Sequence, residues 1–351
     1  MKTKNHLLTL LSVVSLTLAT QVVAQETEEK EETTLPVTLS GSVDTYFRTN
    51  INSLNKFNSG ATVSPGTSFA NGTGFSLGMV NLILTHEGEK SGVVADLVFG
   101  PRGDAAVFGS VDASGDPSNS AIVNQLFVYY NLSENTTLTF GNFNTFLGYE
   151  LISPTGNFNY STSYMFSYGP FSHTGAKADF TLGEASLMLG VFNATDITDT
   201  NPDNTYFGGA QIGYGGAYVN FLFDDDYFQV DLTGGWDVSD ALYVGVNATS
   251  ASDYFSGAAL YVQSPLSASF KLGLRGEYFQ DNGLGLFELD ESVIGLTLTG
   301  NYTAGNLTII PEVRLDSYSQ ENYVVTDVPE SGNPKYASSL SSFLIAAVYS
   351  F

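Results

Sequence analysis

The sequence predicts an all-β fold, namely a transmembrane, antiparallel, up-and-down β-barrel of about 16 strands. Charged residues make up only 14% of the 351 residues although 43% are apolar, a composition that suits strands facing two different media. After residue 24 no apolar run reaches the roughly 18 residues that a membrane-spanning helix needs. Apolar and polar residues instead alternate along segments of about 10 residues, the length of a tilted strand that crosses a bilayer. A closed barrel is the other structure that pairs every backbone group in lipid.

The first 24 residues have the composition of a secretory signal peptide. Lys2 and Lys4 precede an apolar stretch over residues 7–23, and cleavage is expected after Ala24. An uncleaved membrane anchor is the alternative, but the apolar stretch is short for that role. Residues 25–36 then form an acidic tail, which we expect to be solvated in the periplasm.

Alternation with a period of two marks the strands of residues 37–351, which we assign to the barrel. Over residues 228–237 the apolar side chains of Phe228, Val230 and Leu232 alternate with polar ones. Strands of soluble domains are usually shorter, at about 5–6 residues. The same reading predicts strands near residues 37–50, 74–87, 91–101, 121–131, 135–143, 173–182, 184–194, 206–215, 216–224, 226–237, 240–249, 255–263, 267–280, 291–303, 306–317 and 340–351.

The connections between these strands mostly alternate between short and long. Short turns such as Gly215-Gly216 are expected on the periplasmic side, and long segments such as 102–120 and 318–339 on the extracellular side. Both chain ends then lie on the periplasmic side. Tyr349 and Phe351 lie on one face of the last strand, and this terminal pattern resembles the signal that barrels present to the barrel-assembly machinery.

Charge and residue usage exclude several classes of protein. A net charge of −24 repels nucleic acid. The chain has no cysteine, which excludes a disulfide scaffold. Beyond the leader, His86 and His173 are the histidines, and we expect them at opposite ends of the barrel, where they cannot share a catalytic site. We therefore expect no enzymatic activity, no cofactor and no bound metal.

Residues 141–175 read GNFNTFLGYELISPTGNFNYSTSYMFSYGPFSHTG and follow Val128-Tyr129-Tyr130-Asn131. Together with Phe99-Gly100-Pro101-Arg102, this region resembles the OmpL-like putative outer-membrane β-barrel porin family. The resemblance covers roughly residues 40–195 in motif and the remainder in pattern only. It implies a barrel in the outer membrane of a Gram-negative bacterium with a pore function, and it supplies no catalytic residues.

We expect a water-filled channel for passive diffusion of small hydrophilic solutes, with a preference for cations because carboxylates are in excess. A non-conducting barrel that serves as an adhesin, receptor or structural protein is the alternative. The number of strands discriminates between them, because about 16 strands leave an aqueous channel whereas a small barrel fills its lumen with side chains.

Charged residues of the strands fall on the phase that we assign to the lumen. An Arg or Lys facing lipid at mid-bilayer would cost about 2–4 kcal/mol. Opposed basic and acidic walls would act as an electrostatic filter, and the alternative is that the pairs merely keep a wet interior solvated. The predicted pore-lining residues are Asp44, Arg48, Asp96, Lys177, Asp231, Lys271, Arg275, Glu277, Glu312 and Arg314.

Residues 144–172 form the third long connection, and in general porins the third loop folds into the lumen and narrows it. This segment holds many aromatic residues, which need packing. We therefore predict a constriction loop, for which an extracellular cap is the alternative. Its candidate residues are Tyr149, Glu150, Tyr160 and Tyr164.

The expected partners follow from this location. They are outer-membrane lipid and lipopolysaccharide, the barrel-assembly machinery and small hydrophilic solutes. General porins are trimers, and a homotrimer stays open here because lipid-facing and subunit-facing strands look alike in sequence.

Overall fold

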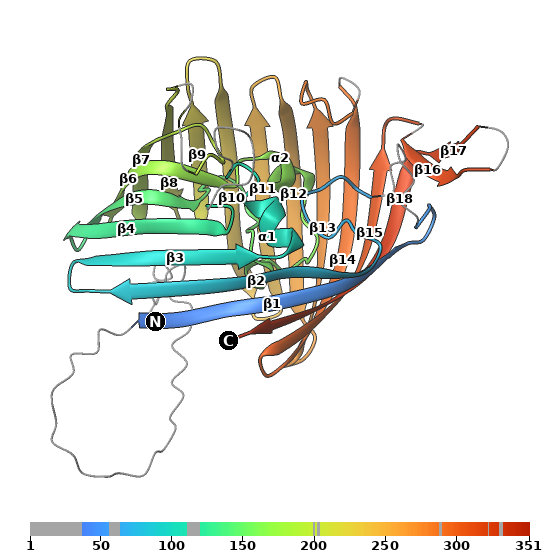
Figure 1. Ribbon diagram of the computed structural model, residues 1–351, viewed down its shortest axis with the longest axis horizontal. Helices are drawn as coiled ribbons and strands as arrows, with labels where there is room; N and C mark the ends of the chain where they lie inside the picture. The colour runs from blue at the N-terminus through green and yellow to red at the C-terminus, as the bar shows by residue number, and fades with distance from the viewer. Residues whose placement is uncertain are drawn as a thin grey trace, which may run out of the picture. The chain divides into compact units, whose positions relative to one another are not determined.

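The computed structural model describes residues 37–55, 64–110, 120–198, 201, 204–287, 290–321, 323–329 and 333–351. The predicted signal peptide (residues 1–24) and acidic tail (residues 25–36) lie outside the described residues. Sixteen of the described strands close into one antiparallel barrel (Figure 1). In chain order these are β1 (Val37–Asn50), β2 (Gly74–Glu87), β3 (Ser91–Phe99), β4 (Val123–Ser133), β5 (Thr136–Asn144), β6 (Ser172–Leu182), β7 (Ala185–Phe192), β8 (Phe207–Tyr214), β9 (Ala217–Phe223), β10 (Phe228–Ser239), β11 (Leu242–Ala251), β12 (Phe255–Pro265), β13 (Phe270–Asp281), β14 (Ser292–Ala304), β15 (Leu307–Tyr318) and β18 (Ser339–Ser350).

Each barrel strand pairs with its neighbours in the chain, and β1 pairs with β18 to close the ring. The closing register places Arg48 opposite Leu344 and Ser42 opposite Ser350. Closure leaves no free sheet edge, so the strands pair with one another all the way round the ring. The prediction of an up-and-down barrel of about 16 strands is confirmed. The further strands β16 (Val324–Asp327) and β17 (Lys335–Ala337) form a separate hairpin between β15 and β18.

The two faces of each strand differ in burial as the alternation predicts. On β10, Leu232 is 42% exposed and neighbouring Asp231 is 1% exposed. Because a side chain that points out of a barrel meets lipid, the exposed phase is the membrane-facing one. Its apolar residues include Val128, Phe140, Val191, Leu260, Leu296, Leu298 and Val313.

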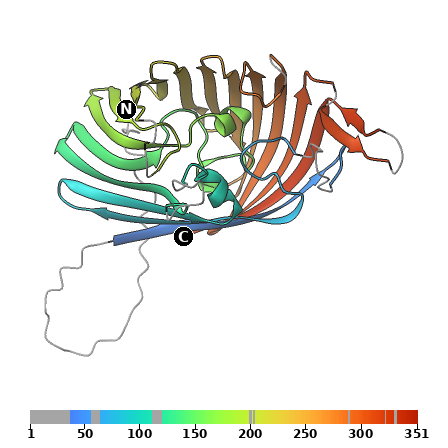
Figure 2. The same ribbon diagram turned by 45° about the horizontal axis from the view of Figure 1, so that its top comes forward.

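The connections separate into two kinds at the two ends of the barrel. Gly183 and Glu184 join β6 to β7, and Gly215 and Gly216 join β8 to β9. Gly215 and Gly216 have φ values of 60° and 87°, a left-handed conformation that glycine adopts without strain and that suits a two-residue hairpin turn. The long connections lie at the opposite end, and residues 101–110 and 145–171 run inward between the strands (Figure 2).

The inward segments carry the helical turns of the described chain. These are α1 (Pro101–Ala106) after β3, and the short helix η2 (Pro154–Gly156) and α2 (Tyr164–Tyr168) between β5 and β6. Ser163 caps α2 by accepting a hydrogen bond from the backbone N–H of Phe166. Among the described residues, no helix has the length and apolar character needed to cross a membrane.

A charge placed on the membrane-facing phase tests this assignment of faces. Leu296 lies within β14 and is 44% exposed. The substitution Leu296→Arg is expected to lower the free energy of unfolding by about 2–4 kcal/mol, because the guanidinium would face hydrocarbon near mid-bilayer. Urea unfolding of the barrel refolded in lipid vesicles measures this loss.

The control is Leu132→Arg near the end of β4 that leads into the short turn to β5, where Leu132 is similarly exposed. A basic residue close to the interface costs about 0–1 kcal/mol. Equal losses at the two positions would contradict the assignment.

Candidate functional site: the inner loop and the barrel wall

Residues 145–171, which we call the inner loop, run from β5 to β6 through the interior of the ring of strands (Figure 2). The loop is rich in aromatic residues, and Tyr160 and Tyr164 are completely buried, with exposures of 1% and 0%. Tyr164 packs with Phe279 of β13 and Phe287, and Tyr160 packs with Tyr46 of β1. The rings that sequence alone places in a long loop therefore form part of the core inside the barrel.

Wall glycines let the loop approach the strands closely. Gly245 of β11 lies under the ring of Tyr149, and Gly273 of β13 lies under the ring of Phe158. A methyl group at either glycine would overlap the ring above it. Tyr149 also stacks on Tyr261, with ring centroids 4.2 Å apart. Two of the 36 glycines of the chain thus leave room on the strands for aromatic side chains of the loop.

Carboxylates of the wall accept hydrogen bonds from the loop backbone. Glu277 of β13 accepts from the N–H of Tyr164 (3.0 Å) and Met165 (2.9 Å). Glu312 of β15 accepts from the N–H of Tyr160 (3.0 Å) and from the hydroxyl of Ser161. The irregular backbone at Tyr160 and the first turn of α2 at Tyr164 and Met165 have no partners of their own for these N–H groups. The wall must therefore supply the acceptors once the loop is inside the barrel.

Arginines satisfy the carbonyl groups of the same strip of backbone. Their guanidinium groups carry several N–H donors in a fixed plane, which suits carbonyl oxygens that point in different directions. The three bonds are Arg102 Nη1 to the carbonyl of Tyr160 (3.2 Å), Arg275 Nη1 to that of Ser161 (2.7 Å) and Arg314 Nη1 to that of Thr162 (2.8 Å). Arg102 lies on the segment that becomes α1, so the loop is held from two sides.

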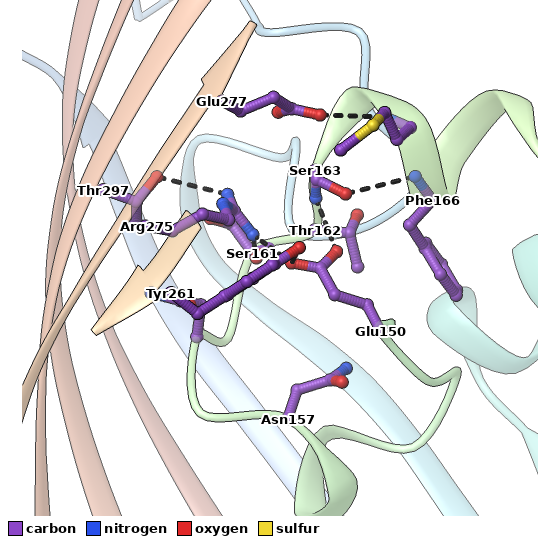
Figure 3. A network of polar contacts seen from close by, with 12 residues as sticks. Glu150, Asn157, Ser161, Thr162, Ser163, Phe166, Tyr261, Arg275, Glu277 and Thr297 are labelled. Carbon is purple, nitrogen blue, oxygen red and sulfur yellow. Dashed lines mark hydrogen bonds and ion pairs between the residues drawn. The ribbon is translucent and has the colours of Figure 1, made fainter. Parts of the chain in front are cut away.

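A buried ion pair joins the loop to β13. Arg275 Nη1 lies 2.6 Å from Glu150 Oε1, and both side chains are less than 5% exposed. Figure 3 shows them directed toward one another between the loop and the wall. Glu150 also accepts from the backbone N–H of Ser163 (2.7 Å), and Arg275 donates to Thr297 (3.1 Å). Each charge therefore has hydrogen-bond partners beyond its counter-ion, as a buried pair requires.

Two further charged groups hold the loop from the β1 and β15 side. Asp44 of β1 accepts from the hydroxyl of Tyr160 and from the backbone N–H of Met79 (3.1 Å). Arg314 pairs with Asp316, and its guanidinium lies 5.3 Å from the centre of the Tyr164 ring. These contacts therefore fix the loop to β1, β15 and β13.

The two ends of the inner loop have their own anchors. Asp231 of β10 accepts from the backbone N–H of Gly148 (2.9 Å). Asp196, in the connection after β7, accepts from the N–H groups of Phe171 (2.7 Å) and Ser172 (2.9 Å). Burial raises the pKa of Asp196 to about 6, and these two hydrogen bonds act in the opposite direction.

The structure places the ten predicted pore-lining residues on the inner phase of the wall in two different settings. Eight are buried rather than exposed to a wet lumen: Asp44, Arg48, Asp96, Asp231, Arg275, Glu277, Glu312 and Arg314. Six of these contact the inner loop, whereas Arg48 donates to the carbonyl of Asn71 (3.1 Å) and Asp96 is held by amide side chains. The loop covers the six that it contacts, because its backbone needs their donors and acceptors.

The remaining two residues keep contact with solvent. Lys177 is half-buried, pairs with Asp179 at 2.9 Å and lies over the ring of Phe143. Lys271 is exposed at the start of β13. All four predicted loop residues, Tyr149, Glu150, Tyr160 and Tyr164, contact the wall.

Asp316 shares the inward phase of β15 with Arg314, as the alternation predicts, although it is not among the predicted pore-lining residues. Sequence reasoning assigned no role in the pore to Arg102, which holds the loop. Arg102 lies outside the strands, where no periodic signal exists, and its guanidinium packs over the rings of Phe69 and Tyr160. It could be found only once the three-dimensional path of its segment was known.

A closed 16-stranded barrel with a loop anchored inside it is the architecture of a porin. The family described as "Putative beta-barrel porin-2, OmpL-like" has a model that matches residues 36–351. The chain belongs to this family. The porin family and its outer-membrane fold place the chain in the outer membrane of a Gram-negative bacterium. Among curated protein sequences, none matches this OmpL-like porin.

Solved outer-membrane proteins share the fold of this OmpL-like chain. The anion-selective porin from Comamonas acidovorans superposes with a TM-score of 0.57 at 11% identity, covering 90% of this chain and 99% of that one. The outer-membrane channel DcaP of Acinetobacter baumannii gives a TM-score of 0.54 at 15% identity, covering 90% and 97%. The trimer form of OmpT of Vibrio cholerae gives 0.50 at 13% identity, covering 90% and 99%. At these identities the likeness shows the fold alone.

The ion pair between Glu150 and Arg275 yields a stability prediction. Glu150→Gln is expected to lower the free energy of unfolding by about 3–5 kcal/mol, because Arg275 would keep a buried charge without its counter-ion. The double substitution Glu150→Met with Arg275→Met is expected to recover most of that loss, because no unpaired charge remains. Urea unfolding in lipid vesicles measures both.

The exposed ion pair between Lys335 and Asp327 is the matched control, with side chains 71% and 48% exposed. Lys335→Met should change the free energy of unfolding by less than about 1 kcal/mol. A double variant no more stable than the single one would contradict the view that an unpaired buried charge causes the loss.

Proposed function

We propose that this porin forms a channel for passive diffusion of small hydrophilic solutes with a preference for cations, and that the inner loop is its constriction. The observation that carries the proposal is the loop itself, which crosses the interior of a closed 16-stranded barrel and is bound to its wall. A barrel of about 16 strands is wide enough to leave an aqueous channel. An anchored loop narrows such a channel without blocking its two ends.

The proposed preference for cations rests on the balance of buried arginines and buried carboxylates inside the barrel. All four arginines of the chain, Arg48, Arg102, Arg275 and Arg314, are buried. They are outnumbered inside the barrel by the buried carboxylates Asp44, Asp96, Glu150, Asp231, Glu277, Glu312 and Asp316. Fixed carboxylates in excess along a pore lower the energy of a passing cation and raise that of an anion. The anion selectivity of the Comamonas acidovorans porin belongs to that protein, which shares only the fold.

Export, assembly and partners complete the proposal. Residues 1–24 would direct export as a cleaved signal peptide, residues 25–36 would remain as a periplasmic tail, and Tyr349 with Phe351 would present the assembly signal. The exposed apolar phase of the strands would contact outer-membrane lipid and lipopolysaccharide, or neighbouring subunits of a homotrimer. No enzymatic activity is proposed, because His86 and His173 lie at opposite ends of their barrel strands.

Single-channel recording tests the function. The mature chain, refolded and inserted in a planar bilayer, is expected to open in steps and to show a cation-favouring reversal potential in a KCl gradient. An anion-favouring potential would overturn the preference for cations. A folded, inserted barrel without conductance would overturn the channel and favour a non-conducting adhesin, receptor or structural barrel.

A further inference from the structure

A small cavity remains between the inner loop and the wall beside Asp231. It is bounded by loop residues that include Gly148 and Gly169, and by β10 and β11 on the other side. It offers about 10 Å³ of room for the centre of a water molecule. That is about the space of one water.

The two sides of this cavity differ in chemistry. The wall presents only polar side chains, from Gln229, Asp231, Asn247 and Thr249. Gln229 donates to the hydroxyl of Thr249 (3.1 Å), so the wall forms a connected polar surface. On the loop side, the N–H of Gly169 donates to Met165 within the loop instead of to the wall. The cavity is thus a seam between the polar wall and loop residues that include the apolar Leu147, Met165 and Phe166.

Asp231 carries a charge that its surroundings do not balance. It accepts from the N–H of Gly148 (2.9 Å) and from the amides of Asn220 (2.8 Å) and Asn247 (2.6 Å), and all three donors are neutral. Within the described ranges it forms no ion pair, whereas Glu150 and Asp316 each pair with an arginine. The field of an unpaired carboxylate therefore acts on whatever occupies the cavity beside it.

We propose that this seam is the narrowest point of the permeation path and that Asp231 is the residue that favours small cations there. The inference rests on the proposed channel function and assigns its selectivity to one place. Amide and hydroxyl oxygens of the wall would replace part of the hydration shell of a monovalent cation such as K⁺, and the carboxylate would offset its charge. An anion entering the same space meets the carboxylate without a basic partner.

Asp96 provides a matched control on another part of the wall. It too is buried, is held by the amides of Asn81, Asn124 and Gln125, and forms no ion pair in the part of the chain that the structure describes. It does not border the seam. Asp231→Asn and Asp96→Asn therefore remove the same charge from similar surroundings.

Reversal potentials in a KCl gradient distinguish the two residues. Asp231→Asn is expected to lower the ratio of cation to anion permeability at least about fourfold, as one unit charge about 5 Å away would in a water-like dielectric. Asp96→Asn should change the ratio much less. The exchange Asp231→Asn with Asn247→Asp returns a carboxylate to the seam and should restore the ratio.

Equal effects of Asp231→Asn and Asp96→Asn, or no effect of Asp231→Asn, would overturn the inference while the channel function stands. A wild-type barrel that does not conduct would instead overturn the proposed function itself. Resistance of the folded barrel to denaturation by detergent confirms that each variant has folded before its current is read.

Cysteine accessibility tests the position of the path independently of charge, because the chain has no cysteine of its own. Thr249→Cys places a thiol at the seam, and Thr299→Cys places one on β14, where Thr299 is completely buried and bonded to Asn159 of the loop (2.7 Å). Ag⁺, which is close to K⁺ in size and bonds to thiolates, should reduce the current of the Thr249→Cys channel and leave the Thr299→Cys channel unchanged. The reverse pattern, or no reaction at position 249, would place the path elsewhere.

Discussion

The structure depends on one constraint, which is that every backbone N–H and C=O inside a membrane barrel must find a partner. The strands meet it by closing the ring between β1 and β18. The inner loop meets it differently, because its irregular backbone has neither helix nor sheet to pair with over residues such as Tyr160 to Thr162. Charged side chains of the wall take over that task, with Glu312 and Glu277 accepting from N–H groups and Arg275 and Arg314 donating to carbonyls.

This arrangement gives the charges of the barrel interior two roles. Where the loop touches the wall, carboxylates and arginines are bound to backbone or to one another and form a rigid polar core, as in the pair of Glu150 and Arg275. Where a small gap remains between loop and wall, we propose that the carboxylate of Asp231, which has no arginine partner, acts on passing solutes. The path of the loop therefore decides which charges stabilise the protein and, on this proposal, which charges act on a permeating solute. On this proposal, selectivity would follow from the carboxylates that lack an arginine partner more than from the total charge.

The sequence was sufficient to predict the fold because the alternation is strictly local. Whether Leu232 or Asp231 faces lipid depends on a single neighbour in the chain, and the turns at Gly183 or Gly215 interrupt the pattern where the strands end. The inward orientation of Glu277 and Arg314 could be predicted for the same reason. Their partners could not, because Tyr164 and Thr162 lie more than a hundred residues away in a segment without periodicity. The role of Arg102 could not be predicted either, because it depends on contacts that form only where α1, the loop and Phe69 meet.

Gly245 and Gly273 leave space for the rings of Tyr149 and Phe158. This close fit limits how the sequence of this porin can change in evolution. A loop on the surface of a protein is free to be exchanged, because its neighbours make few demands on its sequence. Here a new side chain in the loop must find a depression of matching size in the strands, and a new side chain on the strands needs a smaller group above it. Grafting the loop of another barrel onto these strands would leave rings without space on the strands and carboxylates without backbone partners. Loop and wall must therefore change together, as one inherited unit.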